Sequence, residues 1–206
     1  MPPRPTETTA LPDTAFSPLS ALHWRFLHHC PAGLVPAQWR PWLEDRGSLT
    51  RRLQAASGGN FAVQVLRQEF ALPTASEARA LNLAQRRWAL IREVVLIGHD
   101  MPWVYARSVL PLATLSGRLR HLRQLSNRPL GQVLFNAGNM CRDPVQIARL
   151  PCTALPEGLS ITATSALARP QPTLLWGRRS VFRVDDKPLL VAEFFLPGFD
   201  PYNAAH

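Results

Sequence analysis

The chain has 206 residues, a hydrophobic fraction of 46% and a formal net charge of +9. This length is enough for one domain with a substantial core, and no stretch of the sequence approaches the ~20 apolar residues of a membrane span. The 23 basic residues, of which only Lys187 is a lysine, are scattered along the chain. Without a recognition motif or an aromatic platform beside them, they do not predict a nucleic-acid partner.

The N-terminal residues 1–18 are rich in Pro and Thr and lack the apolar core of a signal peptide, so we expect a disordered tail on a cytoplasmic protein. One domain is expected over residues 19–202, followed by a short tail at 203–206. The three cysteines have no C-x-x-C spacing and therefore predict neither disulfides nor zinc. They are Cys30, Cys141 and Cys152.

Short helices are expected over residues 37–43 and 48–56, the second with Ser48 as its N-cap. Alternation of apolar and polar residues predicts a strand over 61–70. Residues 74–77 have the Thr-x-x-Glu pattern of a capping box, which indicates that a helical turn follows.

A β-hairpin is the best-defined unit, with strands over residues 87–97 and 103–110. With a two-residue loop at 99–100, Arg92 would face Arg107 directly across the pair. Two like charges in that arrangement destabilise a sheet unless an anion lies between them or the register differs. The sequence does not fix the register.

The remaining pattern favours a helix over residues 115–125 and a helical turn at 132–135. Residues 151–173 are rich in Pro, Ser, Thr and Ala and predict a loop insertion. A second hairpin is expected from strands at 174–184 and 189–196. Strands joined by tight turns predict an α+β fold, with an antiparallel sheet of about six strands and flanking helices.

Two charged residues lie inside apolar strands and are the candidate site. Glu193 interrupts the apolar run 189–196, and Arg92 interrupts the run 88–97. Each buried charge costs several kcal/mol unless it is paired. Arginine has a planar fork suited to a carboxylate, and Glu193 could accept a hydrogen bond from a hydroxyl, or donate one if burial keeps it protonated. The pair therefore indicates a dry pocket for a small polar anion.

A structural role is the alternative for the same residues, with Arg92 forming an ion pair with a nearby carboxylate. The possible partners are Glu193, Glu93 and Glu69. The sequence contains no P-loop, dinucleotide-binding glycine motif, G-x-S-x-G or H-E-x-x-H. Neither His28-His29 nor His121 has further ligands at useful spacing, so no metal is expected.

Several motifs in order resemble the chorismate lyase (chorismate–pyruvate lyase) family. They include PLATLSG at 111–117, WGRRS at 176–180 and KPLLVAEFFLP at 187–197. Shorter matches are Arg92-Glu93, Pro129-Leu130-Gly131, Leu134-Phe135 and Arg142-Asp143. The resemblance covers about residues 43–202. It implies a monomeric α+β protein with a buried site under helical flaps, which converts chorismate to 4-hydroxybenzoate and pyruvate without a cofactor, as the first committed step of ubiquinone biosynthesis.

The resemblance also implies site residues. Arg92 matches the arginine that binds the ring carboxylate, and Glu193 matches the glutamate at the 4-hydroxyl end. Leu130 matches a backbone contact to the substrate. Leu49 stands where methionine is common, and the similar volume of leucine retains an apolar lid. Arg107 is a weaker candidate, for the enolpyruvyl carboxylate.

Two other function classes are open. A non-catalytic module of this fold, as in winged-helix regulators, would bind an aromatic acid without converting it. Residues 1–40 are too short and too rich in proline to supply the DNA-binding helix-turn-helix of such a regulator. A purely structural protein, in which Arg92 and Glu193 pair, would respond to no ligand.

Overall fold

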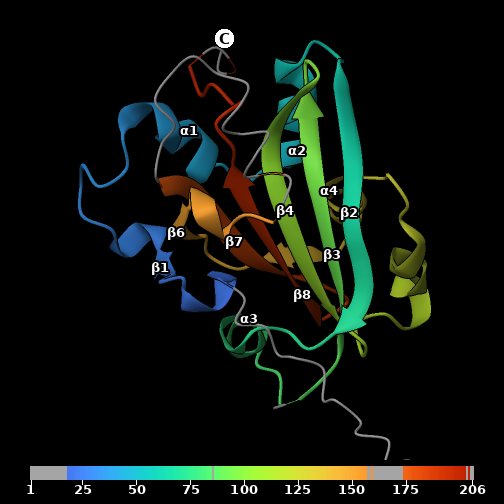
Figure 1. Cartoon of the computed structure of the whole chain (residues 1–206). Coiled ribbons are helices and arrows are strands. Elements are labelled where there is room, and N and C mark those ends of the chain that lie inside the picture. Colours follow the sequence, from blue (N-terminus) through green and yellow to red (C-terminus); the bar gives the residue numbers. More distant parts are fainter. Residues whose placement is uncertain (1–17, 85, 157–158, 160–173, 203, 205–206) are drawn as a thin grey trace, which may run out of the picture.

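The computed structural model describes residues 18–84, 86–156, 159, 174–202 and 204. The predicted tails and the predicted insertion at 151–173 fall largely outside this part of the chain. Within it, the chain forms an eight-stranded antiparallel sheet in the order β1-β6-β7-β8-β4-β3-β2, and β5 also pairs with β7 (Figure 1). The predicted α+β class is confirmed.

The element bounds follow the predicted ones closely. The strands are β1 (Arg25–Phe26), β2 (Phe61–Ala71), β3 (Ala89–Gly98), β4 (Met101–Pro111), β5 (Met140–Arg142), β6 (Gln146–Pro151), β7 (Leu174–Val184) and β8 (Lys187–Phe195). The α-helices are α1 (Arg40–Leu43), α2 (Leu49–Ala56), α3 (Ala75–Ala80) and α4 (Leu130–Phe135). The 3₁₀ helices are η1 (Pro18–Ala21), η2 (Leu27–His29), η3 (Ala37–Trp39), η4 (Gly117–Gln124) and η5 (Cys152–Ala154). The helix predicted over 115–125 is thus a 3₁₀ helix, and β1, β5 and β6 are strands that the sequence pattern did not predict.

Both predicted hairpins are present, and each turns through two residues of positive φ. These are His99 and Asp100 between β3 and β4, and Asp185 and Asp186 between β7 and β8. Two consecutive residues of positive φ are typical of the type I′ turn, whose twist matches that of the flanking strands.

The predicted pairing of Arg92 with Arg107 is wrong. The register between β3 and β4 shifts near Leu96, so that Arg92 faces Ser108 and Glu93 faces Arg107. The cause is one extra residue on β4, Trp103. Its ring lies against Gly98, where a Cβ would come within 2.4 Å of the indole. This β-bulge replaces a like-charge contact with an ion pair.

The two faces of the sheet are covered by different helices and different apolar clusters. The face covered by α1, α2, η4 and α4, termed the pocket face, holds two apolar clusters, which are centred on Trp42 and on Leu122 (Figure 1). The reverse face is covered by α3 and the segment around η1. Because side chains alternate along a strand, neighbouring residues such as Arg92 and Glu93 lie on opposite faces.

A buried ion-pair network lies on the reverse face. Arg107 donates from Nε to Glu77 Oε1 (2.7 Å), from Nη2 to Glu77 Oε2 (3.1 Å) and from Nη1 to Glu93. Glu77 also completes the predicted capping box at the start of α3 by accepting from the Thr74 N–H. All three charged side chains are less than a tenth exposed. The network therefore ties α3 to the neighbouring strands β3 and β4.

Gly177 on β7 is required by close packing rather than by its backbone angles. A Cβ at this position would lie 2.4 Å from the ring of Phe194, the residue directly opposite on β8. A Gly177→Ala variant is therefore expected to lose about 1–3 kcal/mol of unfolding free energy in urea titrations, the usual cost of overpacking. Gly138→Ala is the matched control, since a Cβ there meets nothing within 4 Å. Equal stability of the two variants would contradict this account.

Candidate active site

The predicted site residues surround one small cavity on the pocket face, between the two apolar clusters. Leu49 from α2, Arg92 from β3, Leu130 from α4 and Glu193 from β8 all line it. Its volume is about 40 Å³, far below the roughly 300 Å³ or more of typical ligand pockets. A cavity of this volume has room for only a few water molecules, so a larger ligand would require the covering helices to move.

The sheet register explains where the cavity lies. Arg178, Glu193 and Ala106 stand side by side on β7, β8 and β4, and Arg92 faces Ser108, two residues further along β4. Adjacent strands are about 4.8 Å apart, so two strand spacings separate Arg92 from Glu193. The small side chains of Ala106 and Ser108 leave the space between these charges open.

Arg92 is a buried cation whose hydrogen-bond partners are all neutral. It is 2% exposed, and it donates to Gln68 Oε1 (2.6 Å) and to the carbonyls of Ser126 (2.6 Å) and Arg128 (3.3 Å). Among the residues that the structure describes, no carboxylate lies within ion-pair distance of it. The alternative of a structural ion pair for Arg92 is therefore wrong. Burial lowers the pKa of its guanidinium, and a bound carboxylate would restore the favourable electrostatics of the cation.

Glu193 pairs instead with Arg178, a residue that the sequence analysis did not single out. Arg178 Nε donates to Glu193 Oε2 at 2.7 Å, and the side chains are 1% and 17% exposed, respectively. Arg178 Nη1 also donates to the carbonyls of Trp42 (2.6 Å) and Asp45 (3.0 Å). Arg178 therefore fixes the position of the Glu193 carboxylate, whose oxygens accept hydrogen bonds.

Arg142 from β5 is a third cation on the cavity wall, and it too was missed. Its Nε donates to Ser180 Oγ (3.0 Å), and Nη1 donates to the carbonyls of Asp45 (3.2 Å) and Gly47 (3.4 Å). Its guanidinium carbon lies 5.0 Å from the centre of the Phe182 ring. Burial and the nearby Arg178 charge lower its pKa to about 10, so Arg142 remains a cation at neutral pH.

Arg107 does not belong to this site. It lies on the reverse face, where Glu77 and Glu93 neutralise it. The expectation that it binds the enolpyruvyl carboxylate is therefore wrong, and the reason is the Trp103 bulge, which pairs it with Glu93.

Two helices close the cavity, and the arginines hold the segments that lead into them. Arg178 and Arg142 bind carbonyls of residues 42–47, just before α2, and Arg92 binds carbonyls at 126 and 128, just before α4. The predicted N-cap of α2 is confirmed, since the Ser48 side chain accepts from the Arg51 N–H. The helices are in direct contact, because a Cβ on Gly131 of α4 would lie 3.2 Å from Thr50 Oγ1 of α2.

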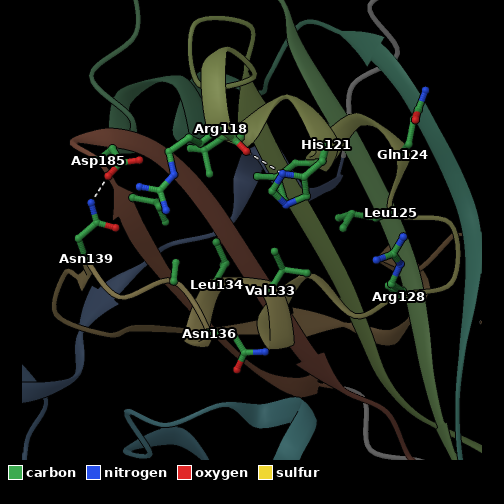
Figure 2. A pocket seen from close by; sticks show the side chains of 14 residues that line it. Arg118, His121, Gln124, Leu125, Arg128, Val133, Leu134, Asn136, Asn139 and Asp185 are labelled. Atoms are coloured by element: carbon green, nitrogen blue, oxygen red, sulfur yellow. Dashed lines mark hydrogen bonds between the residues drawn. The ribbon is translucent and has the colours of Figure 1, made fainter.

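A larger pocket of about 460 Å³ lies beyond α4, between η4 and the end of β7 (Figure 2). Arg118, His121 and Arg128 surround its mouth, and Leu134 and Val133 line it from α4. It contains none of the predicted site residues and no buried charge. Leu134 also lines the small cavity, so α4 lies between the two spaces.

Among the residues that the structure describes, no three or more His, Cys, Asp or Glu side chains group as metal ligands would. No helix in the same part of the chain is long and apolar enough to span a membrane.

The fold and the site define an α+β protein with a small cavity, lined by three arginines and one glutamate, against one face of an antiparallel sheet. The family model described as chorismate lyase matches residues 29–202, and the chain belongs to this family.

Relatives in curated collections agree with this assignment. A protein from Methylococcus capsulatus named "Probable chorismate pyruvate-lyase" is 46% identical over 160 residues, which cover 76% of this chain and 93% of that protein. A protein from Marinobacter nauticus with the same name is 40% identical, and the match covers 82% of this chain and 80% of that protein. The crystal structure of PhnF from Mycobacterium smegmatis has a TM-score of 0.50 at 16% identity, covering 76% of this chain and 67% of that one, which shows a shared fold alone.

Proposed function

We propose that this protein is a chorismate lyase, which eliminates pyruvate from chorismate and leaves 4-hydroxybenzoate. The charge of the cavity carries the proposal. Three arginines and one glutamate line it, a formal net charge of +2, and chorismate is a dianion with two carboxylates. Family membership and the names of the relatives point to the same substrate.

Each predicted site residue has a role in this reaction. Arg92 binds the ring carboxylate, and the Leu130 N–H, in the first turn of α4 where helical N–H groups have no internal acceptor, assists it. Glu193, held by Arg178, accepts a hydrogen bond from the 4-hydroxyl. Leu49 covers the ring from α2 and excludes water.

The reaction breaks two bonds of the substrate and completes an aromatic ring. The C4–H bond yields its electrons to a new C3=C4 bond, and the C3–O bond breaks, so that enolpyruvate leaves with the oxygen. The proton lost from C4 is balanced by one that the enolpyruvate methylene gains to become pyruvate. In this proposal Glu193 lies next to C4 and assists the movement of that proton. Aromatisation supplies the driving force, so the protein contributes orientation and a dry electrostatic environment.

This chemistry requires neither a metal nor an organic cofactor. We expect the protein to act as a monomer in the cytoplasm and to supply 4-hydroxybenzoate for ubiquinone biosynthesis. Cys30 and Cys141 are thiols, as is usual for proteins of a reducing compartment.

The test is to incubate the purified protein with chorismate, without metal or cofactor, and to follow 4-hydroxybenzoate and pyruvate by chromatography. Equimolar formation of both products is expected. Thermal stabilisation by 4-hydroxybenzoate without turnover would instead indicate the non-catalytic binding module. If the protein shows no turnover of chorismate and no stabilisation by 4-hydroxybenzoate, the proposed function is overturned.

A further inference from the structure

The cavity has two cationic regions with different partners. Arg92 lies on β3, and Arg142 and Arg178 lie on the other side of Glu193, on β5 and β7. Arg178 is neutralised by Glu193. Arg142, like Arg92, has no carboxylate within ion-pair distance in the described part of the chain. The site thus holds two uncompensated arginines, with Glu193 and Arg178 between them.

The substrate's own geometry matches this arrangement. In chorismate the ring carboxylate is on C1, whereas the hydroxyl on C4 and the enolpyruvyl ether on C3 are neighbours at the opposite end of the ring. With the ring carboxylate at Arg92 and the hydroxyl at Glu193, the enolpyruvyl group must lie beside Glu193. That is the side on which Arg142 lines the cavity.

We propose that Arg142 binds the carboxylate of the enolpyruvyl group, the part of the substrate that leaves as pyruvate. This inference rests on the proposed function and adds a substrate-binding residue to it. Two donors of the guanidinium hold Ser180 and the backbone before α2. Its Nη2 takes part in no hydrogen bond among the described residues, so it is available for a ligand oxygen.

Binding at Arg142 would also explain how the site distinguishes substrate from product. After the C3–O bond breaks, 4-hydroxybenzoate retains the groups that Arg92 and Glu193 hold, but it no longer carries the second carboxylate. Arg142 would therefore contribute to chorismate binding and to the orientation of the leaving group, and would contribute nothing to the binding of 4-hydroxybenzoate.

The experiment compares two variants, Arg142→Gln and Arg92→Gln, in two measurements. These are kcat/KM for chorismate and the dissociation constant of 4-hydroxybenzoate from calorimetric titration. Loss of one charge-assisted hydrogen bond corresponds to a roughly 10- to 100-fold effect. We expect Arg142→Gln to lower kcat/KM by that factor and to leave 4-hydroxybenzoate binding within about twofold. Arg92→Gln should weaken both.

Two results would overturn the proposal. If Arg142→Gln weakens chorismate turnover and 4-hydroxybenzoate binding equally, its role is only to hold the segment before α2. If it changes neither, Arg142 does not contact the substrate. Failure of the proposed function itself is distinguishable, because the unmodified protein would then form no 4-hydroxybenzoate from chorismate.

Discussion

A Glu193→Gln variant is expected to lose at least about 100-fold in kcat, the scale on which a positioned proton acceptor contributes. The amide keeps the shape of the side chain but removes the charge that Arg178 holds, and with it the base of the proposed mechanism. The measurement is the initial rate of 4-hydroxybenzoate formation at saturating chorismate. A rate within about threefold of the unmodified protein would contradict the role given to Glu193, because a general base contributes far more.

Two further variants separate chemistry from folding. Glu193→Asp keeps the ion pair's charge but shortens the side chain, so it should restore thermal stability more than turnover. Glu44→Gln removes a glutamate that is about half exposed and pairs with Arg40 on the surface. It should change neither rate nor stability. Loss of turnover in a Glu193→Gln protein that still unfolds cooperatively would assign the effect to the site.

An Arg107→Ala variant is expected to lose about 3–5 kcal/mol of unfolding free energy, because two buried carboxylates are left without their cation. Glu77 and Glu93 are each less than a tenth exposed and have Arg107 as their common partner. Urea titration followed by circular dichroism at neutral pH measures the loss.

Arg67→Ala is the matched control for this prediction. Arg67 pairs with Glu69 at the surface, where both side chains are 48% exposed, and such pairs contribute about 0–1 kcal/mol. If the two variants unfold at the same urea concentration, the network on the reverse face does not contribute the stability assigned to it.

Most of the sheet could be predicted because local chemistry specifies it. The capping box at Thr74, the N-cap at Ser48 and the two hairpins all involve residues that lie close together in sequence. The role of Arg178 as the partner of Glu193 could also have been predicted from the sequence. A two-residue turn at Asp185 and Asp186 places residue 178 opposite residue 193, so the turn type alone identifies the partner of Glu193.

Other parts of the site could not be predicted, since they depend on contacts between distant segments. Arg142 lies on a three-residue strand that has no periodicity of its own and exists because it pairs with β7. The partners of Arg92 come from β2 and from the segment before α4, which are 24 to 36 residues away in sequence. No local pattern shows that these partners are neutral.

The extra residue at Trp103 has a consequence for how this sequence can change over time. This residue determines which face of the sheet each later side chain of β4 occupies. With the bulge present, Arg107 pairs with Glu93 on the reverse face, and Arg92 has no carboxylate partner among the described residues. If residue 103 entered the regular ladder instead of bulging, each later residue of β4 would move out of its present register, and Arg92 would face Arg107. Loss of residue 103 itself would keep the present pairing, whereas an insertion or deletion further along β4 would need a compensating change in the strand to preserve it.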